Sequence, residues 1–63
     1  MPEYQQRVVD ELAARKGEVE RLEAFFGTPT FAGLDPADQN LLQEQAPIMR
    51  ALVGVLARRI ARF

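Results

Sequence analysis

The residues of this chain best suited to chemistry are the arginines near its C-terminal end. Residues 45–63 contain four arginines and no acidic residue, whereas residues 1–44 hold all nine carboxylates against four lysines and arginines. The formal net charge of −1 therefore hides a split of −5 against +4. Guanidinium groups bind carboxylates and phosphates through paired hydrogen bonds. This end of the chain is a candidate seat for an anion or for a partner's acidic face. The four arginines are Arg50, Arg58, Arg59 and Arg62.

The sequence has few residues suited to catalysis by a metal ion or a nucleophile. The chain contains no His and no Cys, and its carboxylates are expected mostly on a solvent-facing side, with no pair obviously buried. Gly27 and Gly33 are too isolated to form a phosphate-binding loop. We therefore expect no enzyme, no catalytic residue, no metal site and no cofactor.

Two helical patterns flank a centre marked by proline and glycine, and they predict one all-α antiparallel hairpin over residues 1–63. The first helix, about 2–26, has an apolar seam at alternating steps of four and three, with Arg15 in its one polar slot. Gly27 is expected to end this helix in the left-handed conformation. The seam consists of Val8, Leu12, Val19, Leu22 and Phe26.

The connector, 27–35, is expected to contain one helical turn that begins at Pro29 behind a Thr28 cap. Asp35 then caps a second helix, about 36–62, with Pro36 at its first position. Pro47 interrupts the helix hydrogen bonding, so we expect a kink there rather than a break. Gly17 and Gly54 lie inside the helices. Each glycine either allows close helix packing or reflects sequence drift, or it exposes backbone to a ligand.

The second helix carries more apolar surface than a two-helix hairpin covers. One seam runs from Leu42 to Phe63, and a second runs beside it through Leu41, Ile48, Val53 and Val55. A chain of 63 residues has a thin core and here has no possible disulfide or zinc staple, so another copy or another protein must cover the surplus. We predict a homo-oligomeric bundle, a dimer or tetramer. Its expected interface is Leu41, Gln45, Ile48, Met49, Leu52, Val55 and Leu56; Gln45 either fixes the register or contacts a ligand.

The hairpin brings the two chain ends together. If facing positions add to roughly 65, Arg59 lies near Arg7 and Val8, Arg62 near Tyr4, and Arg50 near Arg15. With Glu11 one turn further in and the free N–H groups of the first helix, this open end is a candidate phosphate-ligand site, Tyr4 stacking on a base. Alternatively, Arg58 and Arg62 only complement the helix dipole and pair with nearby carboxylates. Arg7 and Arg59 border the apolar seams, where a charge needs a partner.

Other partners and locations are less compatible with the sequence. Four arginines give a small footprint and the acidic first helix repels a long phosphate backbone, so polymeric nucleic acid is not expected. Membrane-surface binding fails because the seam has few large aromatics. The longest apolar stretch, Leu52 to Ala57, is far short of a ~20-residue span, and the start of the chain does not resemble a signal peptide. We expect a soluble protein of the cytosol.

Several spaced segments resemble a known kind of protein. They are Tyr4-Gln-Gln-Arg7-Val8-Val9-Asp-Glu11-Leu12, Leu22-Glu-Ala-Phe25, Phe31-Ala-Gly-Leu34, Gln45-(x3)-Met49 and Leu56-(x2)-Arg59-Ile60. The pattern covers nearly the whole chain and is similar to very small helical-hairpin proteins of tailed phages and prophages, including crAss-like phages. It departs from that pattern at Pro47 and at Val53, where a Tyr is expected.

Hairpins of this kind resemble the sponge proteins that phages use against CBASS and Thoeris immunity. Such sponges oligomerise and enclose cyclic di- or trinucleotides between subunits without catalysis. The resemblance implies that Arg7 and Arg59 bind phosphates, that Tyr4 stacks on a base, and that Glu11 accepts from a base edge or orients an arginine. It also implies action in the host bacterial cytosol. The alternatives are an adaptor that docks its apolar seam on a host or phage protein, and a structural phage component.

Overall fold

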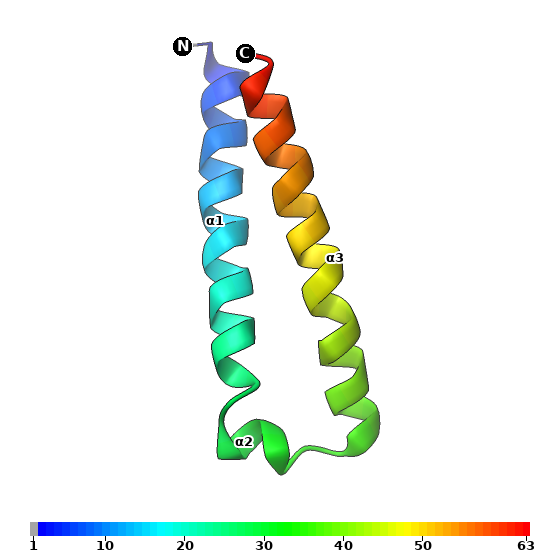
Figure 1. Cartoon of the computed structure of the whole chain (residues 1–63). Helices are drawn as coiled ribbons and strands as arrows, with labels where there is room; N and C mark the ends of the chain where they lie inside the picture. The colour runs from blue at the N-terminus through cyan, green and yellow to red at the C-terminus, as the bar shows by residue number, and fades with distance from the viewer. Residues whose placement is uncertain (1) are drawn as a thin grey trace.

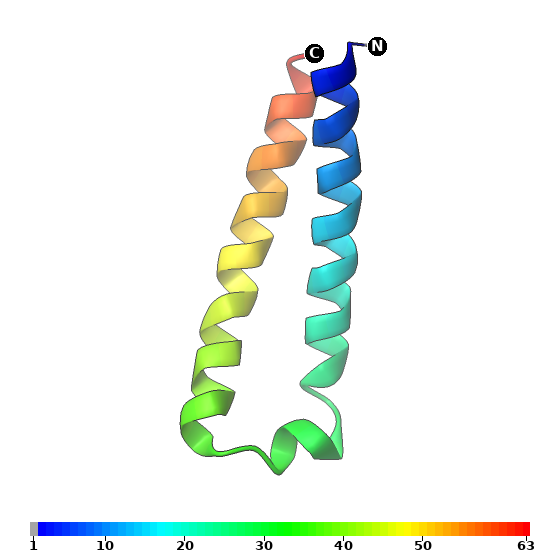
Figure 2. The same ribbon diagram turned by 180° about the vertical axis from the view of Figure 1, so that it is seen from behind.

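Two long helices account for most of the chain, and a short one joins them. The computed structural model describes residues 2–63, in the order α1 (Glu3–Phe25), α2 (Pro29–Ala32) and α3 (Pro36–Ala61). α1 and α3 lie side by side and antiparallel, with both chain ends together, and α2 lies across the other end (Figures 1 and 2). The hairpin measures 45 × 15 × 13 Å. The predicted all-α fold with a long helix pair is therefore confirmed.

The core is a single line of side chains between the helices. Leu56 is the largest fully buried side chain, at 1% exposure. Burying a leucine contributes about 1.5–3 kcal/mol, so this position is a main contact of the hairpin itself. We expected Leu56 between copies, and it lies instead inside one copy. The buried hydrophobic residues are Val8, Val19, Phe31, Ala46 and Leu56.

The end of α1 differs from the expected glycine cap. No glycine within residues 2–63 has a positive φ, so the left-handed conformation predicted for Gly27 is wrong. The Gly27 N–H donates to the Ala24 carbonyl at 3.2 Å, and the Thr28 hydroxyl donates to the Phe25 carbonyl at 2.7 Å. These shorter-range bonds satisfy the last carbonyls, and the left-handed residue is not needed.

The other caps follow the sequence signals. Thr28 accepts a hydrogen bond from the Phe31 N–H at 3.3 Å, and Asp35 accepts one from the Ala37 N–H at 2.8 Å. Both helices begin with proline at the first or second position. α3 continues through Pro47 as one helix, so the expectation that this proline would not break it is confirmed.

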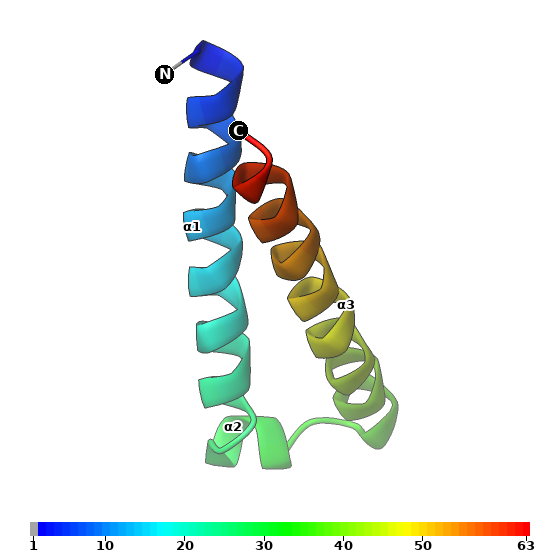
Figure 3. The same ribbon diagram turned by 45° about the horizontal axis from the view of Figure 1, so that its top comes forward.

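Aromatic side chains fill the connector end of the hairpin. The two helices are further apart there than at the chain ends, and α2 lies between them (Figure 3). The ring of Phe31 on α2 is 5.8 Å from Phe25 and 5.0 Å from Phe26, centroid to centroid. Such edge-on and tilted pairs contribute about 0.5–1.5 kcal/mol beyond their burial. They hold α2 against the end of α1.

A glutamine side chain ties the connector to α3. The Gln39 Nε2 lies 3.0 Å from the Phe31 carbonyl oxygen, and 3.1 Å from those of Ala32 and Leu34. These carbonyls lie at the end of α2 and in the turn that follows it, where the Phe31 carbonyl also accepts from the Leu34 N–H at 3.1 Å. Because the bonds join residues five to eight positions apart, Gln39 fixes the angle at which α3 leaves the connector.

We expect Gln39→Glu to destabilise the hairpin by about 1–3 kcal/mol at neutral pH, because a carboxylate cannot donate and repels the three carbonyls. Chemical denaturation followed by circular dichroism measures this. Gln43→Glu, an exposed change of the same type one turn along α3, is the matched control and should alter stability little. Equal effects of the two substitutions would contradict the tie between connector and helix.

We expect Gly54→Ala to stabilise the fold by about 0.5–1 kcal/mol. A Cβ built at Gly54 meets no atom within 4 Å, and alanine loses less backbone entropy in a helix than glycine. The midpoint of thermal unfolding measures the change. A loss of stability instead would mean that backbone at Gly54 is closely approached by something outside the single chain.

Candidate functional site at the open end

The open end of the hairpin is where the first turn of α1 meets the last turn of α3. The rings of Tyr4 and Phe63 lie 6.0 Å apart, at 76° to each other. Both side chains are nevertheless largely exposed, Tyr4 at 60%. An edge-on pair leaves the faces of the rings available to a planar ligand. The prediction had placed Arg62 beside Tyr4 and had not paired Tyr4 with Phe63.

Positive charge gathers at this end. Arg58 and Arg59 lie in the last turn of α3, Arg62 follows as its C-cap, and all three are exposed. Across from them, Pro2 is the N-cap of α1 and makes no side-chain capping bond, so the first N–H groups of α1 remain free. Guanidinium groups and free helix N–H groups both attract anions. The end of the hairpin therefore has the chemistry of an anion site.

Arg7 already has a partner in the single chain. Its guanidinium donates to the Glu3 carboxylate one turn earlier on α1, and both side chains are mostly exposed. Arg7 therefore does not border a buried seam, and that expectation is wrong. The Arg7 side chain is 74% exposed, so its charge is solvated, and its partner lies on its own helix. An anionic ligand at Arg7 must displace the Glu3 carboxylate. This costs little free energy, because an exposed ion pair contributes little stability.

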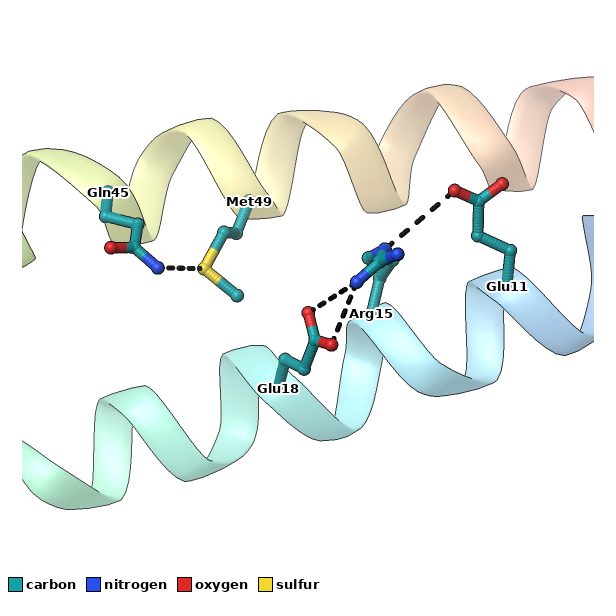
Figure 4. Close-up of polar contacts among 5 residues, drawn as sticks. All are labelled: Glu11, Arg15, Glu18, Gln45 and Met49. Atoms are coloured by element: carbon teal, nitrogen blue, oxygen red, sulfur yellow. Dashed lines mark hydrogen bonds and ion pairs between the residues drawn. The ribbon is translucent and has the colours of Figure 1, made fainter.

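Glu11 belongs to a polar cluster that follows α1. Arg15 donates to both oxygens of Glu18 at 2.8 Å, and its Nε lies 3.8 Å from the Glu11 carboxylate. Figure 4 shows this cluster on α1, across from the Gln45–Met49 pair on α3. The hydrogen bond and charge of Glu18 raise the pKa of the Arg15 guanidinium, with a smaller contribution from Glu11. Within the chain Glu11 therefore lies beside Arg15 and not beside Arg7.

An apolar stripe remains exposed along α3. Leu41 is 63% exposed and Ile48 is 70% exposed, and Leu52 and Val55 continue the same face. Of the other residues expected at the interface, Met49 is half-buried. Gln45 is exposed and its amide donates to the Met49 sulfur at 3.3 Å. Single side chains of this kind are common on surfaces, whereas a continuous row along a helix marks an interaction surface.

A shallow groove of about 190 Å³ lies on the middle of the hairpin, away from the open end. It is lined by Lys16, Val19, Glu20, Arg50 and Val53. Val53 therefore faces this groove and not the exposed apolar stripe, where we expected it.

Arg50 pairs with Glu23 at 2.7 Å, whereas we expected it beside Arg15. Glu23 lies eight residues from Arg15, about 12 Å along the helix, so the Arg50 side chain pairs closer to the connector than predicted, whereas the Tyr4–Phe63 contact keeps the predicted register at the open end. Tyr4 lies twelve residues before Lys16, which is about 18 Å. We place the candidate site at the open end, where the arginines gather, and not in this groove.

The described residues contain neither a candidate metal site nor a candidate membrane span. Within residues 2–63, no group of three or more acidic residues is placed to hold a metal ion. Neither long helix described here has a stretch apolar enough to cross a bilayer.

The comparison with protein families assigns the chain. A family model described as Sequestin matches residues 2–62, which is nearly the whole sequence. The chain belongs to the Sequestin family. This name fits a protein that sequesters a ligand, and a Sequestin member is expected to bind rather than to catalyse. No curated protein and no solved structure matches the chain.

We expect the contact between Tyr4 and Phe63 to stabilise this Sequestin member by about 0.5–1.5 kcal/mol, because edge-on aromatic pairs contribute that much. A double-mutant cycle of Tyr4→Leu and Phe63→Leu, measured by denaturation, isolates the pair from the burial of each ring. The cycle would contradict the contact if the two single losses simply added.

Proposed function

We propose that this protein sequesters a cyclic oligonucleotide immune signal between its copies, and thereby antagonises the defence of a host bacterium against phage. The observation that carries the proposal is membership of the Sequestin family over residues 2–62. The proposed action takes place in the host cytosol and involves no chemical step. The protein lowers the free concentration of the signal by binding it.

The open end supplies the groups that such a ligand needs. Arg7 and Arg59 bind the phosphates, with Arg62 beside them, because guanidinium forks match phosphate oxygens. The exposed face of Tyr4 stacks on a base, which contributes about 1–3 kcal/mol in comparable sites. Glu11, one turn further along α1 than Arg7, accepts a hydrogen bond from a base edge. The presence of the Tyr4–Phe63 pair and the exposed arginines at one end supports this assignment.

Association of copies is part of the proposal. The candidate ligand-binding side chains at the open end of one hairpin, Tyr4, Arg7, Arg59 and Arg62, are exposed, whereas small-ligand sites usually enclose most of the ligand. A second copy provides the missing wall. The exposed apolar residues of α3 supply a surface for that association.

A second candidate function is favoured by the same apolar residues. A protein-interaction adaptor would dock Leu41, Ile48, Leu52 and Val55 on a host or phage protein, as amphipathic helices do in apolar grooves. The two functions differ in their small ligand. An adaptor has no small ligand, and its charged open end would not bind nucleotides.

We expect a cyclic di- or trinucleotide to raise the thermal midpoint of the protein. A ligand at 100 times its Kd adds about 2.7 kcal/mol of stability, which corresponds to a shift of about 10–20 °C in a domain of this size. A thermal-shift panel of cyclic nucleotides measures it. Since the chain has one Tyr and no Trp, quenching of tyrosine fluorescence reports stacking at Tyr4 directly.

Matched variants locate the site. Arg7→Ala and Arg59→Ala should each weaken binding by about tenfold or more, because each removes a charged phosphate contact. Arg21→Ala, which removes an exposed arginine near the connector end of α1, is the control and should leave affinity unchanged. Glu3→Gln should strengthen binding slightly by freeing Arg7. Full affinity in folded, oligomeric Arg7→Ala and Arg59→Ala proteins would reject the site.

A further inference from the structure

The exposed face of α3 has the spacing of a coiled-coil seam. Its residues follow one another at alternating steps of four and three over eighteen positions, and all of them are exposed. Within the hairpin this face has no partner helix, because α1 covers the neighbouring side through Ala46 and Leu56. We call this face the outer stripe. It consists of Leu41, Gln45, Ile48, Leu52, Val55 and Arg59.

Charges of opposite sign flank the two halves of the outer stripe. Glu44 lies beside its first half and Arg58 beside its second half, with Ala51 at the midpoint between them. The three residues are seven positions apart, so they follow the same side of the helix. All three are exposed, and the ion pairs within residues 2–63 involve neither Glu44 nor Arg58.

We propose that a second copy of this chain packs on the outer stripe with its own α3 antiparallel, about a two-fold axis near Ala51. In that arrangement Ile48 packs against Leu52 of the second copy, and Gln45 against Val55 of the second copy. The symmetry makes each contact twice. Leu41 is covered by the aliphatic stem of Arg59, as long charged side chains often cover apolar surface.

The charges select this direction. In the antiparallel pair Glu44 lies opposite Arg58 of the second copy, twice, and the small Ala51 meets itself where the helices are closest. A parallel pair in register would stack Arg59 on Arg59 and align the two helix dipoles in the same direction. The pattern of charge along α3 therefore complements itself only when one copy is reversed.

The dimer also completes the candidate ligand site. It places the Leu41 end of the second copy beside the open end, against the stem of Arg59, while the guanidinium stays at the surface. The dimer has two such sites, at opposite ends. This consequence rests on the proposed function, whereas the pairing of the helices does not.

Single cysteines test the direction, because the natural chain has none. In the antiparallel dimer Gln45→Cys and Val55→Cys meet only in a mixture of the two variants. Each cysteine lies ten residues, about 15 Å along the axis, from the position that faces it on an identical copy, too far for a disulfide. We expect the mixture to form the mixed disulfide at least about tenfold more readily than either variant alone forms its own. Mass spectrometry identifies each product.

The outcomes separate the possibilities. Self-linking of each variant alone would show a parallel pair and overturn the proposal. An oligomer without any of these links would overturn it by placing the interface elsewhere, and a monomer would leave the outer stripe to a different protein. Cyclic-nucleotide binding without the mixed link would reject this dimer but retain the proposed function. Formation of the mixed disulfide without nucleotide binding would support this dimer and reject the proposed function.

A charge exchange gives an independent test that requires no oxidation. Glu44→Arg and Arg58→Glu should each weaken dimerisation by about tenfold, because two attractive pairs become repulsive. The double variant should recover the affinity of the natural chain, measured by analytical ultracentrifugation. In a parallel pair the double variant recovers nothing, since Glu44 of one copy and Arg58 of the other then lie fourteen residues, about 21 Å, apart along the axis. Circular dichroism of each variant confirms that the hairpin is intact.

Discussion

The structure depends on a constraint of geometry: a helix in a hairpin can bury only one stripe of its surface against its partner. α1 has one apolar stripe, and the hairpin buries it through Val8 and Val19. α3 has apolar residues on two neighbouring faces, and the hairpin covers only the one that includes Ala46 and Leu56. A core of this size supplies about 3–5 kcal/mol at most. The remaining face of α3 therefore decides whether the folded chain is stable alone.

The connector shows which parts of the fold depend only on residues close to one another in the sequence. Thr28 and Asp35 cap the helices that follow them, and Pro29 and Pro36 stand at their first turns. These signals act over two or three residues, so the sequence alone identifies them. The bonds from Gln39 to the connector carbonyls were not predicted, because they depend on how α2 is placed in space. The Gly27 conformation was missed because the Thr28 hydroxyl took over the role of the expected cap.

The candidate site was predictable in outline and not in its pairings. An antiparallel hairpin brings the chain ends together whatever its exact register, so the gathering of arginines around Tyr4 follows from topology. The partners of individual side chains depend on shifts of a few residues between the helices. Arg50 pairs with Glu23, and Tyr4 contacts Phe63, neither of which was predicted. Arg7 pairs with Glu3 one turn away on its own helix, because residues four apart on a helix are neighbours whatever the register of the hairpin.

The separation of charge along the chain and the surplus apolar face of α3 act together. If the ligand binds between copies, as we propose, then the same association that covers the apolar face also creates the anion site. Binding and assembly are then linked, and each strengthens the other by mass action. The free protein needs no preformed cavity and no large core, since both arise on association. A chain of 63 residues can in this way present a site larger than one copy contains. Residues 45–63 contain no carboxylate, so the arginines at the end of α3 have acidic neighbours only on α1, such as Glu3, which already pairs with Arg7.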